Sequence, residues 1–192
     1  MTSGRLTLCA DAHIPLSKGL GMNVGLFALR VVVGSLFAAH GSQKLFGWFG
    51  GFGIRGTGGY MESVGLRPGG LMAGAAGASE LVGGSLLGIG LLVPFAATVL
   101  AGTMVVAART DHRGKGLWIY NSGYEYVLTN AVIVVALSFN GAGSWSVDAA
   151  IGWHLAGLVW GIGASVVALL GAVVVPGVFG ARAKTVAETS TS

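Results

Sequence analysis

FALRVVVGSLFAAHGSQKLFG, residues 27–47, is an apolar run of helical length that carries the basic side chains Arg30, His40 and Lys44. Ionisable groups are costly in lipid and are usually functional where they occur. At about 100° per residue around a helix, Lys44 lies about 40° and His40 about 80° from Arg30, so all three share one side. That side must face other helices rather than lipid.

The composition is that of an integral membrane protein. Charged residues make up 9% and hydrophobic residues 53% of the 192 residues, whereas soluble proteins are about 25% charged. The mean hydropathy is +0.76. The 35 glycines indicate close packing, because small residues let membrane helices approach each other. The net charge of +4 comes from residues scattered over loops, which excludes a nucleic-acid-binding protein. We expect an all-α, polytopic membrane helix bundle.

The chain has one cysteine, Cys9, which excludes an internal disulfide, a Cys-x-x-Cys redox pair and an iron–sulfur ligand set. Haem would need axial ligands, and only His40 and His112 are predicted on one side of the bundle, at a separation that the sequence does not fix. We expect no metal site and no cofactor held by the chain alone. Any thiol chemistry then belongs to a partner.

Five apolar runs predict membrane-spanning helices, which need about 20 residues each. They cover residues 24–46, two helices within 71–108, a shorter helix over 124–139 and a C-terminal helix over 151–175. The run 71–108 is too long for one span, and Gly88-Ile89-Gly90 and Pro94 divide it.

These runs predict four segments of the chain. They are an N-terminal tail at 1–21 with Met22 as an alternative start, a four-helix transmembrane domain at 22–148, an additional transmembrane helix at 149–176 and a polar tail at 177–192. Residues 47–69 are rich in glycine and predict a loop or re-entrant segment with a short amphipathic turn at 60–64. We expect the polar C-terminal tail to be disordered.

Basic residues predict the orientation in the membrane. With five spans, one side of the membrane receives Arg5 and Lys18, and the other side receives Arg55, Arg67, Arg109, Arg113, Lys115, Arg182 and Lys184. Short cytoplasmic loops carry an excess of Lys and Arg. The side with more basic residues is therefore predicted to be cytoplasmic, together with the C-terminus.

The predicted depths of the buried ionisable groups suggest a polar cluster. At about 1.5 Å per residue, Glu80 lies about 15 Å and Arg30 about 24 Å from the basic side, a gap that an Arg side chain can bridge. Arg30 is therefore expected to pair with Glu80 near the midplane. His40, Lys44 and Glu125 lie closer to the basic side. These five residues are the candidates for ligand binding or proton relay, with Arg109, His112 and Tyr124 as secondary candidates.

Each candidate also has a purely structural interpretation. Arg30 and Glu80 can be an ion pair that only locks two helices together. His40 can be an interhelical hydrogen-bonding group, and Lys44 can snorkel to the interface. Glu125, near the membrane edge, can be a capping or anchoring residue.

Several segments together resemble the DoxX family of small bacterial membrane proteins. They are Leu29-Arg30, the block from His40 to Gly47, Phe49-Gly50-Gly51, the block from Glu80 to Gly84, and Gly123-Tyr124-Glu125. The resemblance covers about residues 22–148 and implies a four-helix core in the bacterial plasma membrane. It also implies an association with membrane redox systems. A relative is a subunit of a thiosulfate:quinone oxidoreductase, and others are proposed to tether enzymes such as superoxide dismutase and a sulfurtransferase.

The first functional hypothesis is a subunit of a membrane redox or oxidative-stress complex, whose polar pocket binds a quinone or a lipid. Charged donors suit ligand oxygen atoms, and a carboxylate or imidazole can relay protons. The second hypothesis is a small proton-coupled transporter. The third is a structural membrane anchor for redox enzymes. In each case we expect contact with membrane lipids, and a homo-oligomer is compatible with all three.

Overall fold

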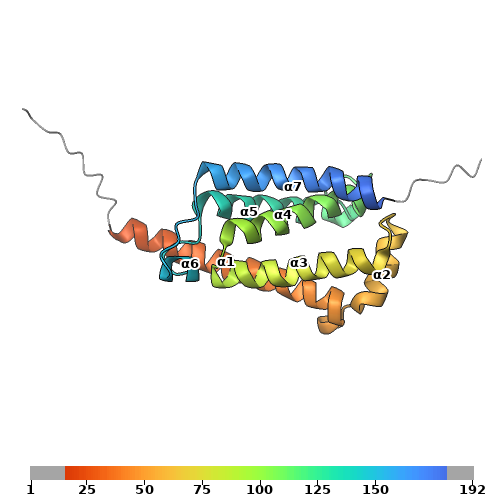
Figure 1. Cartoon of the computed structure of the whole chain (residues 1–192), viewed down its shortest axis with the longest axis horizontal. Coiled ribbons are helices and arrows are strands. Elements are labelled where there is room, and N and C mark those ends of the chain that lie inside the picture. The colour runs from red at the N-terminus through yellow and green to blue at the C-terminus, as the bar shows by residue number, and fades with distance from the viewer. Residues whose placement is uncertain (1–15, 181–192) are drawn as a thin grey trace, which may run out of the picture.

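The computed structural model describes residues 16–180, which form a bundle of antiparallel helices (Figure 1). The helices are α1 (Leu16–Phe46), α2 (Gly53–Ser63), α3 (Gly69–Ile89), α4 (Val93–Thr110), α5 (Glu125–Asn140), α6 (Val147–Ala150) and α7 (Leu158–Phe179). Two short 3-10 turns, η1 (Trp48–Gly50) and η2 (Ile119–Asn121), lie in the connections.

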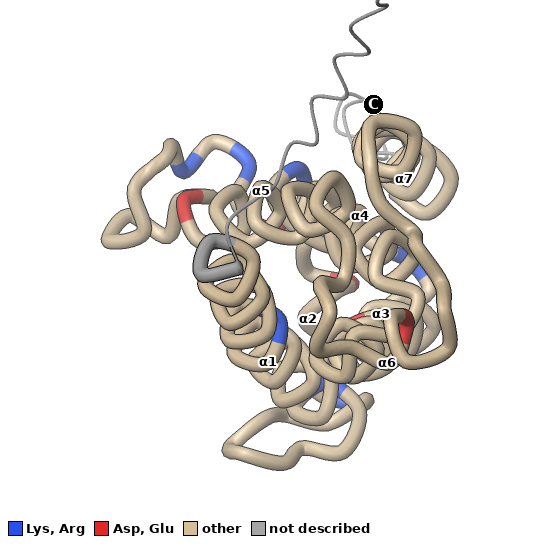
Figure 2. Tube along the Cα trace, turned by 90° about the vertical axis from the view of Figure 1, so that its left-hand side faces the viewer, with Lys and Arg blue, Asp and Glu red and all other residues tan. Residues whose placement is uncertain are grey.

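The long helices form two layers. α1, α2 and α3 make one layer, and α4, α5 and α7 make the other (Figure 1). α4 packs against α3, α5 and α7 and so joins the two layers. Seen along the bundle, α1 and α7 lie on opposite sides (Figure 2).

Within residues 16–180, four helical segments are long and apolar enough to cross a membrane. They are Gly19–Phe46 within α1, α3, α4 and α7, and α5 is a shorter apolar helix. The predicted fold class is therefore confirmed, including the additional C-terminal span. The predicted division of residues 71–108 is also correct, because Gly90 ends α3 with a left-handed φ of 73° and Pro94 lies in the first turn of α4, where proline costs no helical hydrogen bond.

The helix boundaries differ from the sequence prediction in three places. α1 begins at Leu16 rather than at residue 24. Residues 53–63 form the whole of α2, where a short turn at 60–64 was expected. α7 begins at Leu158 rather than at residue 151, because Gly152 and Gly157 adopt positive φ angles and interrupt the helix. Arg5, Cys9, Arg182 and Lys184, which the predictions of orientation and of thiol chemistry used, lie outside the described residues.

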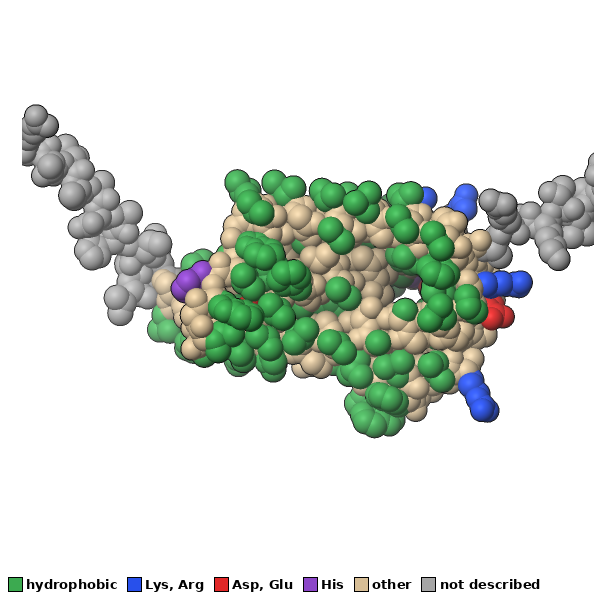
Figure 3. Space-filling model, in the orientation of Figure 1, with side chains coloured by type: hydrophobic (Ala, Val, Ile, Leu, Met, Phe, Trp, Pro, Cys, Tyr) green, Lys and Arg blue, Asp and Glu red, His purple; other side chains and the backbone are tan. Residues whose placement is uncertain are grey.

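Basic side chains gather at one end of the bundle, where α1 ends, α3 begins and α4 ends (Figure 3). This basic end contains Arg55 in α2, Arg67 before α3, and the loop after α4. Lys18 lies in the first turn of α1, at the opposite end. The spatial arrangement agrees with the loop pattern from which the orientation was predicted, and the cytoplasmic location of the basic end stays a prediction.

Glycines bring the backbones of α1 and α3 into direct contact. A Cβ atom added to Gly34 would lie 2.5 Å from the carbonyl oxygen of Gly84, and one added to Gly41 would lie 2.4 Å from the nitrogen of Leu81. A Cβ atom on Gly84 would in turn lie 2.6 Å from the nitrogen of Ala38. No larger residue fits at these positions without moving a helix, so the glycines fix the register of α1 on α3.

Replacing Gly84 by valine tests this contact. We expect Gly84→Val to lower the free energy of unfolding by about 1–3 kcal/mol, the usual cost of overpacking a tight interface, in denaturant titrations of the detergent-solubilised protein. Gly25→Val on α1 is the matched control, because a Cβ atom there meets nothing within 4 Å. Equal stability of the two variants would contradict a register set by close backbone contact.

Candidate functional site

A buried ion pair joins α1 and α3. Lys44 Nζ donates to Glu80 Oε1. Glu80 is 1% exposed, and the Lys44 side chain is 25% exposed. The second carboxylate oxygen, Glu80 Oε2, is buried and has no hydrogen-bond partner among the described residues. Lys44 therefore reaches into the bundle, and the alternative that it only snorkels toward the interface is wrong.

The register of α1 on α3 produces this pair. A Cβ atom on Gly77 would lie 3.2 Å from Lys44 Cβ, and Glu80 follows Gly77 by three residues, which is nearly one helical turn. The long Lys44 side chain spans that turn. Because a buried carboxylate without a partner is strongly unfavourable, the Lys44 ammonium compensates the charge of Glu80 within the bundle.

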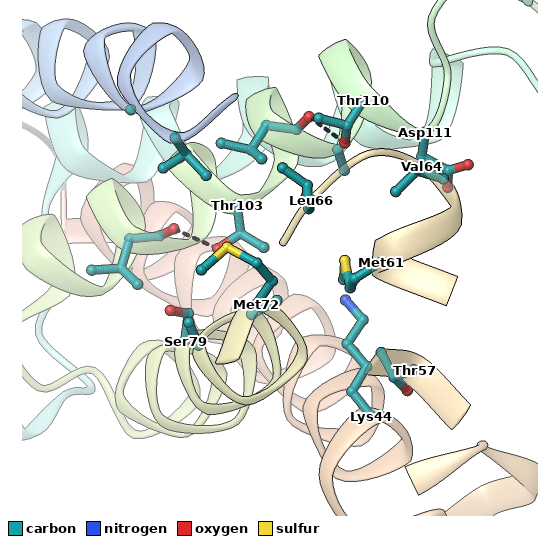
Figure 4. Close-up of a pocket in the computed structure, with 18 of the residues that line it drawn as sticks. Lys44, Thr57, Met61, Val64, Leu66, Met72, Ser79, Thr103, Thr110 and Asp111 are labelled. Carbon is teal, nitrogen blue, oxygen red and sulfur yellow. Dashed lines mark hydrogen bonds between the residues drawn. The ribbon is translucent and has the colours of Figure 1, made fainter. Parts of the chain in front are cut away.

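A cavity of about 380 Å³ adjoins the ion pair. Lys44 lines it, and its side chain extends from α1 toward Met61 (Figure 4). The cavity runs along α2, α3, α4 and α7 toward the basic end, and its walls are mainly apolar. Its polar lining residues are Lys44, Thr57, Tyr60, Ser79, Thr98, Thr103, Thr110 and Asp111.

Tyr60 and Asp111 line the cavity at the basic end and bond to each other. The Tyr60 hydroxyl donates to Asp111 Oδ1, which joins α2 to the loop after α4. Burial and this hydrogen bond raise the pKa of Tyr60 to about 12. Burial alone would raise the pKa of Asp111, but the hydrogen bond from Tyr60 and that from Lys115 Nζ, at 3.3 Å, outweigh burial and hold it below its ordinary value. The contact therefore links a neutral phenol to an ionised carboxylate at neutral pH.

Arg30 belongs to a different polar centre, near the other end of the bundle. It is completely buried, and its Nη1 lies 3.4 Å from the carbonyl oxygens of both Leu87 and Gly88. Its Nη2 donates to the carbonyl oxygen of Trp145 at 2.5 Å. The predicted Arg30–Glu80 pair is wrong, because the glycine contact places Arg30 beside the turn between α3 and α4.

Asp148 is the acidic residue of this second centre, and the sequence interpretation missed it. It is 1% exposed. Its Oδ1 accepts from the Leu92 N–H at 2.9 Å and its Oδ2 from the Val93 N–H at 3.3 Å. The carboxylate therefore caps the start of α4, and it lies near enough to Arg30 to interact with it electrostatically. Asp148 lies just before the last apolar run of the sequence, and an acidic residue in that place was the signal that could have identified it as a candidate.

His40 and Glu125 lie away from the cavity. His40 is exposed, its Nδ1 lies 3.1 Å from the Leu36 carbonyl oxygen, and its ring centroid lies 6.3 Å from that of Tyr126 on α5. Glu125 Oε2 accepts from the Ile119 N–H at 3.0 Å. This bond connects α5 to η2 in the loop before it, and the start of α5 has no side-chain cap bond.

The secondary candidates lie in or beside the connection from α4 to α5. His112 Nδ1 lies 2.6 Å from the Ser122 carbonyl oxygen. Arg109 and Tyr124 are exposed. Within residues 16–180, no group of three His, Cys, Asp or Glu side chains could hold a metal ion. The structure thus brings together only Lys44 and Glu80 from the five main candidates.

The fold and the site define a multi-pass membrane helix bundle with a buried ion pair beside an apolar cavity. The DoxX family model matches residues 25–113, which contain Lys44, Glu80, Tyr60 and Asp111. The chain is also 31% identical over 115 residues to "Putative oxidoreductase CatD" of Bacillus subtilis (strain 168), an alignment that covers 60% of this chain and 79% of the relative. This chain belongs to the DoxX family. No solved structure matches it.

Replacing Lys44 tests whether it compensates the buried charge of Glu80. We expect Lys44→Met to lower the free energy of unfolding by about 3–5 kcal/mol, because Glu80 is left without its compensating charge. Adding Glu80→Gln to Lys44→Met should recover most of that loss. Denaturant titrations of the solubilised variants measure both effects. Glu80→Gln alone completes the cycle. If the losses in free energy of unfolding of Lys44→Met and Glu80→Gln simply add in the double variant, the two side chains do not interact.

Proposed function

We propose that this protein is a membrane subunit of a redox complex and that it binds a quinone in the cavity beside Lys44 and Glu80. The cavity of about 380 Å³ falls within the range of about 300–1,000 Å³ that is typical of small-molecule sites. Such sites combine apolar walls with a few well-placed polar groups. The single observation that carries the proposal is the buried ion pair at the wall of this apolar cavity.

Lys44 suits an oxygen atom of a quinone. It has three N–H donors, and its bond to Glu80 leaves donors for a ligand carbonyl oxygen. Glu80 is 1% exposed and does not line the cavity, so a ligand meets the ion pair through Lys44. A bound quinone would supply redox chemistry, because it takes up electrons together with protons. Glu80 positions the Lys44 ammonium at the cavity wall through their ion pair.

The relatives favour a redox role over other uses of such a cavity. The description of the Bacillus subtilis relative names an oxidoreductase. A separate oxidoreductase would then deliver electrons to the quinone as a partner of this chain, and soluble enzymes such as superoxide dismutase or a sulfurtransferase would be tethered beside it. We place the protein in the bacterial plasma membrane with its basic end in the cytoplasm, where a soluble partner could meet it.

A second candidate function is proton-coupled transport, which the same ion pair supports. A buried carboxylate paired with an ammonium can alternate between protonation states, and the cavity reaches the basic end at Tyr60 and Asp111. Proton-driven solute uptake in reconstituted vesicles, in the absence of quinone, would favour this function. A structural anchor predicts neither uptake nor ligand binding.

Quinone binding to the purified protein in nanodiscs tests the proposal. We expect Lys44→Met to weaken binding by roughly tenfold to a hundredfold, since a hydrogen bond to a charged group contributes about 1.5–3 kcal/mol. Calorimetric titration with a short-chain quinone gives the affinities. His40→Gln and Glu125→Gln are the controls, because both residues lie outside the cavity lining, and they should bind quinone like the parent protein.

The result that overturns the proposal is a parent protein that binds no quinone, or a Lys44→Met variant that binds it as tightly as the controls. Thermal unfolding of each variant shows whether a loss of binding reflects a loss of folding. Since Lys44→Met alone is expected to be less stable, Lys44→Met with Glu80→Gln provides a stable variant in which binding should still be lost.

A further inference from the structure

The cavity extends between the two layers on the side where α3 and α7 face each other. Ala75 of α3 and Val167 of α7 both line it and are both exposed on the surface of the bundle. α4, which packs against both helices, lies behind them. The space-filling view has a hollow between the layers at this place, toward the basic end (Figure 3). The cavity therefore has a side opening, distinct from its end at Tyr60 and Asp111.

This opening lies at the depth of the lipid tails. Along α4, the cavity lining runs from Thr110, the last residue of the helix, back to Thr98. The twelve steps from Thr98 to Thr110 correspond to about 18 Å of helix, against a hydrocarbon core about 30 Å thick. A molecule that leaves the cavity sideways thus passes into lipid rather than into water.

The walls of the opening are apolar in spite of their threonines. Thr98 Oγ1 donates to the Pro94 carbonyl oxygen at 2.7 Å, and Thr103 Oγ1 donates to the Val99 carbonyl oxygen at 3.0 Å. These hydroxyl protons are therefore used within α4. Gly102 and Gly171 add space without adding polarity. Such a passage suits a hydrocarbon chain.

We propose that the cavity is loaded from the bilayer between α3 and α7, and that its ligand is a lipid-soluble molecule whose hydrocarbon chain lies in this opening while its polar head meets Lys44. The proposal rests on the proposed quinone site, because the same continuous cavity is lined by Lys44 at one wall and by Val167 and Gly171 at another. The hydrocarbon chain in the opening and the polar head at Lys44 are thus two parts of one ligand.

α7 contributes a wall of the opening. α7 lies beyond residues 25–113, which the family model matches. Gly171 lines the cavity, and a Cβ atom added there meets nothing within 4 Å. A large side chain at this position would fill the opening without displacing the backbone. The residue at 171 is therefore placed to determine which chains fit.

Phenylalanine at two glycines of α7 tests the opening. Gly171→Phe fills it, whereas Gly163→Phe is the matched control, because a Cβ atom on Gly163 also meets nothing within 4 Å and Gly163 does not line the cavity. The probes are a quinone with a long isoprenoid chain and a benzoquinone without a chain, each titrated into protein in nanodiscs. We expect Gly171→Phe to weaken binding of the long-chain quinone by about tenfold or more and to leave binding of the chainless quinone unchanged. Gly163→Phe should bind both probes like the parent.

The outcomes separate this inference from the proposed function. If the parent binds neither probe, the quinone site itself is wrong. If the parent binds both and Gly171→Phe binds the long-chain quinone equally well, the site stands and the side opening is wrong. If Gly171→Phe abolishes binding of both quinones, position 171 does not act on the hydrocarbon chain of the ligand alone, and this inference is wrong. Ala75→Phe on the facing helix is a second variant, and its binding of the two quinones is compared in the same way. Thermal unfolding of all variants excludes misfolding as the cause.

Discussion

The close contact between α1 and α3 is the constraint on which the rest of the structure depends. Gly34, Gly41 and Gly84 let the two backbones touch. Only a register that places these glycines against the facing backbone allows so close an approach. That register places Lys44 one turn from Glu80 and places Arg30 beside the end of α3. In lipid, where apolar burial gives helices little reason to associate, such packing and the polar contacts that it permits carry much of the association energy.

Two charged centres follow from this register, and they have different consequences. The terminal nitrogens of Arg30 bond backbone carbonyl oxygens and hold the turn between α3 and α4 to the connection before α7, while its buried Nε has no partner among the described residues. The Lys44–Glu80 pair also has one atom without a partner there, Glu80 Oε2, but it differs from the first centre because its ammonium borders a cavity. We regard the first centre as structural and the second as the functional site.

The sequence predicted the elements of the fold well but not the contacts between them. Hydropathy and length located the spans, and Gly90 and Pro94 located the turn between α3 and α4. Counting residues also estimated the depth of each ionisable group along its own helix. It could not supply the register between helices, so Arg30 and Glu80 were paired wrongly although both are buried. Asp148 and the Tyr60–Asp111 contact were missed for the same reason, because each depends on segments that meet only in three dimensions.

Disulfide cross-linking in the membrane tests this register most directly. In a Cys9→Ser background, Lys44→Cys with Gly77→Cys should form a disulfide. A Cβ atom added to Gly77 would lie 3.2 Å from Lys44 Cβ and 2.7 Å from Leu45 Cγ, so a small shift that relieves the contact with the Leu45 side chain brings the pair into the Cβ separation of about 3.5–4.5 Å that disulfides need. Val33→Cys with Gly77→Cys should not form one, although it would if Arg30 lay beside Glu80. Mass spectrometry after mild oxidation measures both yields. Cross-linking of the second pair in place of the first would contradict the register and, with it, the site.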